Sequence, residues 1–137
     1  MRKLALVLIF FLLAATIVSH IMITENAPTK ITIPMRVNVD NTPGSVGFDT
    51  GTELLTFGRL GSGSTSKRTL KIENNENYPQ KVTYSFTGEL APWVNLLAEY
   101  YLLDPQTMME IPVTLTVPSN TSTGNHTGEM TLLFKKK

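Results

Sequence analysis

The stretch Ile31–Asp40, ITIPMRVNVD, alternates apolar with polar side chains. Its apolar members occupy every second position: Ile31, Ile33, Met35, Val37 and Val39. Because successive side chains of a strand point to opposite faces, this period of two predicts a half-buried β-strand. Pro34 lacks a backbone N–H, so we expect it at a sheet edge, at the start of a pairing or at a bulge.

The same alternation recurs along the rest of the chain, between short stretches rich in Gly, Pro and Asn. It is found at Leu55 and Phe57, at Leu70 and Ile72, at Val82, Tyr84 and Phe86, at Ile111, Val113, Leu115 and Val117, and at Met130, Leu132 and Phe134. Val46–Thr50 and Trp93–Leu97 are further candidate strands, whereas Glu89–Leu103 fits neither period well and has room for one helical turn. The pattern predicts an all-β domain over residues 31–137, an immunoglobulin-like antiparallel β-sandwich of seven to eight strands.

An apolar stretch precedes this domain. Leu4–Ile23 carries no charge, and only Thr16, Ser19 and His20 interrupt it. As a helix, 20 residues span roughly 30 Å, the thickness of the bilayer core. We therefore expect residues 1–23 to form one N-terminal transmembrane helix, with residues 4–23 in the lipid bilayer, and residues 24–30 to form a short stalk.

The orientation of this anchor follows from the charges beside it. Arg2 and Lys3 favour a cytoplasmic N-terminus, which makes the chain a single-pass protein of the cell membrane with an extracytoplasmic C-terminal domain. A cleaved signal peptide is the alternative, since a charged start and an apolar run are also its signature. In that case the domain is secreted.

The charge balance and the absence of Cys exclude several function classes. The chain has 12 Lys+Arg against 11 Asp+Glu, which gives no basic footprint for nucleic acid. With no Cys it forms no disulfide and no thiolate metal site. We expect no cofactor.

Residues 54–134 resemble the immunoglobulin-like domains of the ASH, MSP and PapD-like kind that occur in bacterial and archaeal envelope proteins. The matching elements are LTFG (55–58), LKIEN (70–74), APWV (91–94), LDP (103–105), VTLTVP (113–118) and GNHTG (124–128). Two positions depart from the pattern: Gln106 stands where Gly is common, and His126 stands where a turn usually carries Tyr. The resemblance implies a non-catalytic module that packs against other proteins or polymers at the cell surface.

Few residues suggest chemistry of their own. His126 is the only His after the apolar stretch, and no nucleophile motif accompanies it, so we expect no enzyme and place His126 in a turn. Acidic and amide side chains at Glu73–Asn77 and at Asp40, Asp49 and Glu53 could hold calcium, but their spacing fits solvated turns better.

Two sets of residues are weak candidates for a site. Trp93, Tyr100 and Tyr101 either stack on a ligand such as a sugar or fill the core. Asn120 and Asn125 begin glycosylation sequons, although two sequons are what chance alone would give.

Two functions are compatible with these features. The first is a membrane-anchored extracytoplasmic module with a structural or protein-interaction role in a cell-envelope assembly, whose partners are other envelope proteins or a surface polymer. The alternative is a secreted, pilus-like filament subunit. In it, signal cleavage frees the Ile31–Val39 strand to complete the sheet of a neighbouring subunit by strand addition.

Overall fold

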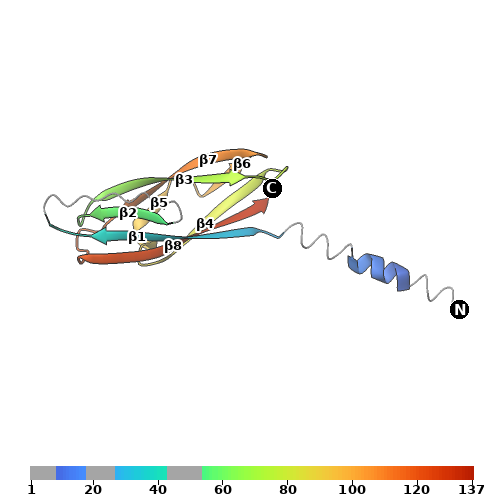
Figure 1. The fold of residues 1–137 in the computed structure, drawn as a ribbon, viewed down its shortest axis with the longest axis horizontal. Coiled ribbons are helices and arrows are strands. Elements are labelled where there is room, and N and C mark those ends of the chain that lie inside the picture. Colours follow the sequence, from blue (N-terminus) through green and yellow to red (C-terminus); the bar gives the residue numbers. More distant parts are fainter. Residues whose placement is uncertain (1–8, 18–26, 43–53) are drawn as a thin grey trace.

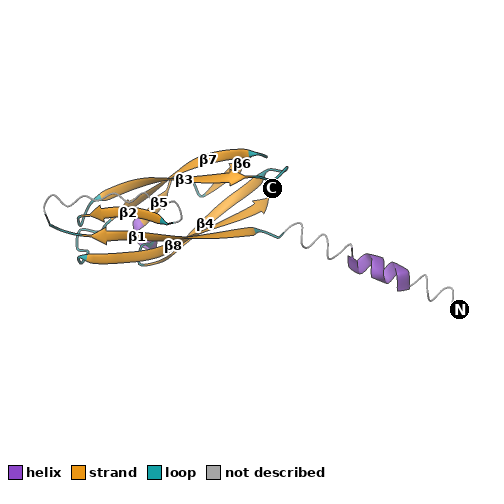
Figure 2. Ribbon diagram, in the orientation of Figure 1, coloured by secondary structure: helices purple, strands orange, loops and turns teal. Residues whose placement is uncertain are grey.

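In the part of the chain that the structure describes, eight strands form two facing sheets (Figures 1 and 2). The computed structural model describes residues 9–17, 27–42 and 54–137. Sheet A has the order β2-β1-β8-β4-β6, and sheet B has the order β3-β7-β5. The strands are β1 (Thr29–Val39), β2 (Leu55–Leu60), β3 (Thr65–Asn74), β4 (Gln80–Gly88), β5 (Val94–Leu96), β6 (Tyr100–Leu103), β7 (Thr107–Thr116) and β8 (Gly124–Lys136). The predicted all-β sandwich is thus confirmed.

Most of the predicted strands are present, and the differences lie where the period is least clear. β1 begins at Thr29, so two residues assigned to the stalk already pair with β8. In the ambiguous stretch, Ala91–Trp93 form a 3-10 turn and a short β5 follows it. The sequence did not indicate β6, the edge strand beside β4. The candidate strand Val46–Thr50 lies outside the described residues.

The prediction of a purely antiparallel sandwich was wrong, because β1 and β2 run parallel. Met35 lies opposite Leu55 and Val39 lies opposite Leu60. Parallel neighbours need a crossover of about a dozen residues or more. The 15 residues between the two strands (40–54) supply that length, whereas hairpin turns join only antiparallel strands.

The two strands that contain proline lie inside their sheets, not at the edges. Pro34 pairs with Glu129 of β8 at a point just before the β1–β2 ladder begins at Met35. Pro112 pairs with Thr69 of β3, just beyond the residues of β7 that pair with β5. Among the described residues, each proline therefore has a ladder partner on one side only, and the missing N–H breaks no second ladder.

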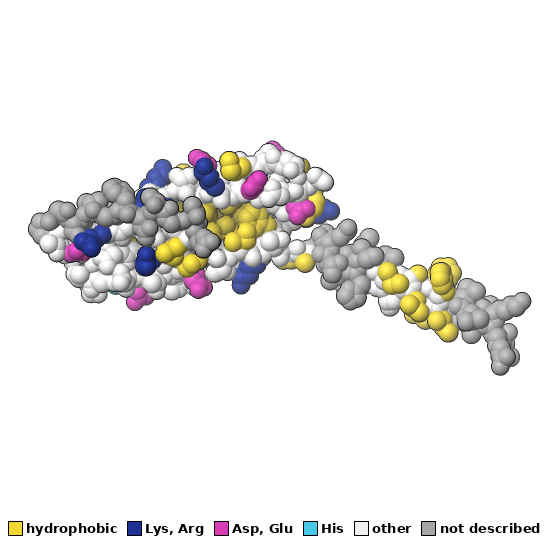
Figure 3. All heavy atoms as spheres, in the orientation of Figure 1, with side chains coloured by type: hydrophobic (Ala, Val, Ile, Leu, Met, Phe, Trp, Pro, Cys, Tyr) yellow, Lys and Arg dark blue, Asp and Glu magenta, His cyan; other side chains and the backbone are white. Residues whose placement is uncertain are grey.

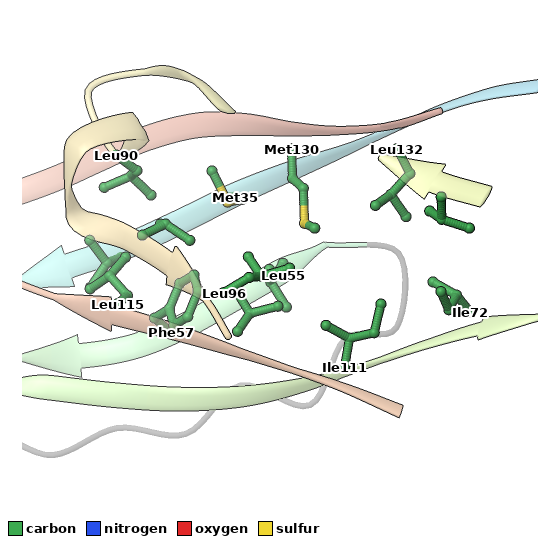
Figure 4. Packing of buried hydrophobic residues seen from close by; sticks show 14 of the residues in the cluster. Met35, Leu55, Phe57, Ile72, Leu90, Leu96, Ile111, Leu115, Met130 and Leu132 are labelled. Atoms are coloured by element: carbon green, nitrogen blue, oxygen red, sulfur yellow. The ribbon is translucent and has the colours of Figure 1, made fainter. Parts of the chain in front are cut away.

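The core fills the space between the sheets with side chains from alternate positions (Figure 4). Sheet A contributes chiefly Met35, Val37, Val39, Val82, Met130 and Leu132, and sheet B contributes Ile72, Ile111, Val113 and Leu115. All of these are at most 4% exposed. Burying each such side chain contributes about 1.5–3 kcal/mol, so the core rather than any turn stabilises the arrangement.

The N-terminal stretch and the surface give two further observations. Residues 9–17 are helical, and within the described part of the chain no helix is both long enough and apolar enough to cross a membrane. On the face drawn in Figure 3, basic and acidic side chains of the described residues are interspersed. That face offers no one-sign surface of the kind that attracts a polyanion.

Candidate functional site

β1 is the first candidate site, because it joins two parts of sheet A that are otherwise not adjacent. All eleven of its residues lie in register with β8, from Thr29 opposite Phe134 to Val39 opposite Gly124. Its second half also pairs with β2. Removing β1 would leave β2 without its neighbour and would uncover the core beneath Met35, Val37 and Val39. Sheet A therefore depends on the strand nearest the N-terminus of the domain.

The second candidate is the end of the sandwich at which β1 finishes and β8 begins, which we call the loop end. It comprises residues 40–42, the turn 61–64 and the loop 117–123. Ser62 links all three, since its backbone N–H donates to Asn41 Oδ1 (2.8 Å) and its hydroxyl donates to the backbone oxygen of Thr121 (2.9 Å). The Gly63 N–H donates to the Val117 oxygen at 2.9 Å. These bonds hold the loop end in one arrangement.

A single turn places Trp93 at the loop end. Leu90 and Val94 are buried on either side of the 3-10 turn, and the Trp93 N–H donates to the Leu90 oxygen at 3.0 Å. Pro92 has no N–H to satisfy and its fixed φ suits the start of such a turn. Trp93 is half-buried and packs against the core from this position.

His126 lies in strand β8 and not in a turn, contrary to the sequence-based expectation. Its position belongs to the inward row of β8, and its ring centroid is 5.1 Å from that of Trp93. The imidazole therefore packs against the indole ring of Trp93. Nε2 lies 2.9 Å from the Ser122 oxygen and Nδ1 lies 3.2 Å from Glu89 Oε2. Both partners are acceptors, so a neutral ring donates to only one of them.

A shallow depression of about 460 Å³ opens beside this ring pair. It is lined by Glu89, Trp93, Pro118, Asn120, Thr121, Ser122 and His126. The side chain of His126 is 13% exposed, whereas that of Glu89 is 64% exposed and faces water. Glu89 and Ser122 could not be found from the sequence, because Glu89 and its partner His126 are 37 residues apart.

The two tyrosines proposed to act with Trp93 lie elsewhere, on β6. Tyr101 faces Val82 across the β4–β6 ladder and packs against the core, with its ring centroid 6.5 Å from that of Tyr84. Tyr100 points to the opposite face, where Lys81 Nζ lies 4.2 Å from its ring centroid. The ring contact of Trp93 is with His126 instead. The three residues therefore do not form one stacking platform.

The two sequons differ in their surroundings. Asn120 is exposed in the turn before β8, and its side chain makes no hydrogen bond to another described residue. Asn125 is exposed on β8, where its Oδ1 accepts a hydrogen bond of 2.7 Å from Asn38 Nδ2. Glycosylation at either residue stays a prediction, and Asn120 has the freer side chain.

The candidate calcium ligands do not form a cluster within the described residues. No group of three or more acidic or His side chains there could hold a metal ion. Asn74, the second residue of the stretch Glu73–Asn77, is fully buried, and its amide donates to backbone oxygens of Tyr78, Leu103 and Asp104. It fixes a turn. Asp49 and Glu53 lie outside the described residues.

No family model and no curated protein sequence matches the chain. Among solved structures, the DraE adhesin in complex with chloramphenicol succinate is 11% identical, with a TM-score of 0.44, and the match covers 82% of this chain and 99% of that one. The AfaE-3 adhesin from Escherichia coli is 10% identical, with the same TM-score and the same two coverages. Likeness at this level bears on neither the function nor the binding residues of this chain.

Proposed function

We propose that the chain is a non-catalytic structural subunit of an extracytoplasmic assembly, in which β1 of one copy completes sheet A of the next. The observation that carries this proposal is the position of β1. It is the first strand of the domain, yet it lies between β2 and β8 and pairs with both. The first strand of a domain, when it has such a place in the sheet, can be supplied by a neighbouring copy without changing the register.

The length of the β1–β2 connection supports the exchange. Within one copy the connection runs from the end of β1 back to the point where Leu55 lies opposite Met35. That return covers four residues of strand, about 13 Å. The 15 residues 40–54, if extended, reach roughly 50 Å. The connection is therefore long enough for the parallel crossover within one copy, and it is also long enough for β1 to enter the sheet of a neighbour.

Export fits this role. Arg2, Lys3 and the apolar stretch Leu4–Ile23 have the order of a signal sequence. Its removal places β1 close to the new N-terminus, where the strand can leave its own sheet. The subunit would then act at the cell surface, and its partners would be other copies of the same chain or neighbouring envelope proteins.

A second candidate function keeps β1 in its own sheet and retains the apolar stretch as an anchor. The observation that favours it is that Thr29, where the domain begins, lies opposite Phe134, near the end of the chain. Both ends of the domain are therefore at the pole away from the loop end. An anchored module would present the loop end to envelope partners, with residues 4–23 in the bilayer.

Single cysteines distinguish the two functions, because the chain has no Cys of its own. Thr32 lies opposite Thr131 across the β1–β8 ladder. We would produce Thr32→Cys and Thr131→Cys as separate proteins, mix them during assembly and oxidise them. Opposed side chains are close enough for a disulfide. Strand exchange predicts a covalent pair that contains one molecule of each variant.

The matched control uses Ser85, which flanks Thr131 from β4. Ser85→Cys mixed with Thr131→Cys should give no covalent pair, because β4 and β8 stay in one copy, whereas the double variant should cross-link internally. Absence of the Thr32–Thr131 pair in assembled material would contradict the exchange. The intact mass of the natively produced protein gives a second test: loss of residues 1–23 rules out the anchor, and their retention rules out the freed strand.

A further inference from the structure

We infer that the depression at the loop end binds a neutral, hydroxyl-rich saccharide. It is formed by β8, the loop that precedes β8 and the turn that carries Trp93. None of its lining residues belongs to β1. The site is therefore the same whether β1 comes from the same copy or from a neighbour, and the inference does not rest on the proposed strand exchange.

The depression gathers polar groups that have no partner among the described residues. The Trp93 indole N–H, the Asn120 amide and the Ser122 hydroxyl make no side-chain hydrogen bond there. Glu89 uses Oε2 toward His126, and its Oε1 is free. The lining thus offers three donor groups and at least two acceptor oxygens, together with one indole ring. A sugar ring offers the complementary set, with apolar C–H faces for the indole and hydroxyls that both donate and accept.

These groups are held in place before any ligand arrives. The Thr121 hydroxyl donates to the Pro118 oxygen at 2.8 Å, and the Thr121 N–H donates to the same oxygen at 3.2 Å. His126 Nε2 lies within hydrogen-bond distance of the Ser122 oxygen, at 2.9 Å. Because these bonds already order the loop, a ligand that binds to Asn120 and Ser122 would cause little further loss of conformational entropy in the loop.

The residues that line the depression favour a neutral sugar over other polar ligands. The lining contains no Lys or Arg, so a phosphate or an acidic sugar would meet the Glu89 carboxylate without a cationic partner. An ammonium group offers only donors and would leave the indole N–H and the Asn120 amide hydrogens unpaired. Sugar hydroxyls both donate and accept, so a neutral saccharide has a complementary group for each of these donors and acceptors.

The fluorescence of Trp93 gives a direct test, because it is the only tryptophan in the chain. We would titrate the full-length protein, made without glycans on Asn120, with mono- to trisaccharides of glucose, galactose, mannose and N-acetylhexosamines. A saturable change in emission is expected with at least one of them. n-Butylamine, which is protonated at neutral pH, and sialic acid, titrated in the same way, represent cationic and anionic ligands and should give none.

Variants test which groups make the contacts. Asn120→Ala should weaken saccharide binding at least about tenfold, the loss expected when a ligand hydrogen-bond partner is removed from a preformed site. Asn95→Ala, an equally exposed asparagine on β5 outside the depression, should leave binding unchanged. Both side chains are exposed, so both variants should fold. No saturable change with any sugar, a response to n-butylamine or sialic acid alone, or equal affinity of Asn120→Ala and the parent would each overturn the inference.

Discussion

Gly88 and Gly128 lie directly opposite each other in the β4–β8 ladder, so close that a Cβ on Gly88 would stand 2.8 Å from the Cα of Gly128. A Cβ on Gly128 would lie 2.7 Å from the Thr87 oxygen. Both values are shorter than real contacts, and each obstacle is backbone. Gly88 also has a φ of +83°, which side chains rarely adopt. At this close contact β4 ends against β8, and two residues later Leu90 is buried in the core.

We predict that Gly128→Ala destabilises the fold by about 1–3 kcal/mol, because the added methyl can be accommodated only by moving backbone. Urea unfolding followed by circular dichroism measures the change. Gly61→Ala is the control, since its Cβ would meet nothing closer than 3.5 Å, and its effect should stay within about 0.5 kcal/mol. Equal stability of the two variants would show that the strands do not approach as closely as described.

Gln106 has a strained backbone conformation. Its φ is +56°, and its side-chain amide donates to the Asn75 oxygen at 2.6 Å. We predict that Gln106→Ala lowers stability by about 1 kcal/mol, because the bond is lost and the strain stays. Gln106→Gly also loses the bond but relieves about 1–2 kcal/mol of strain, so it should be more stable than the alanine variant. Chemical denaturation of both variants tests this order, and a less stable glycine variant would contradict it.

Asn74 is the buried polar centre of the pole opposite the loop end. It is 0% exposed, its Nδ2 donates to three backbone oxygens, and its Oδ1 accepts from the Glu76 N–H. Asn74→Ala should cost about 2–4 kcal/mol, because it leaves these groups without partners. Asn74→Asp should be no better, since a carboxylate cannot donate to carbonyls. Thermal unfolding is the measurement, and the exposed neighbour Asn75→Ala serves as the control. A near-neutral Asn74→Ala would mean that water replaces the amide.

Ionisation of the Tyr84 phenol should lower the stability of the fold at high pH. Burial, followed by the nearby Tyr101 and Glu99, raises the pKa of the Tyr84 phenol above its ordinary value, and its hydroxyl donates to the Ala98 oxygen at 2.7 Å. Since the unfolded chain loses this proton at lower pH than the folded chain does, the stabilisation is complete below about pH 10 and is lost as the pH rises through the folded pKa.

Urea unfolding at a series of pH values tests this dependence. The free energy of unfolding should fall from about pH 10 upward, and the fall should be smaller in Tyr84→Phe, which has no phenol to ionise at that position. An absorbance titration at high pH should show a tyrosine that ionises above the ordinary pKa of about 10, and Tyr84→Phe should remove that step. The same pH profile in parent and variant would disprove the assignment to Tyr84.

Local patterns in the sequence predicted the strands and the two-layer architecture. Alternation at Ile31–Val39 and at Met130–Phe134 identified β1 and β8, because a strand with one buried face must place apolar residues at every second position. The alternation of apolar and polar residues did not identify β6, because Tyr100–Leu103 has the sequence YYLL. Both faces of this short strand carry apolar residues, so no period of two is visible.

What the sequence alone determined, then, is which face of most strands is buried, since that depends only on neighbours along the chain. Only the tertiary structure decided which strands lie side by side, because pairing depends on contacts between distant residues. The parallel pairing of β1 with β2 is possible because the connection between them is long, and a long connection allows either direction. The approach of Trp93, Glu89 and His126 follows from packing the Ala91–Trp93 turn against β8. Neither arrangement leaves a signal in local spacing.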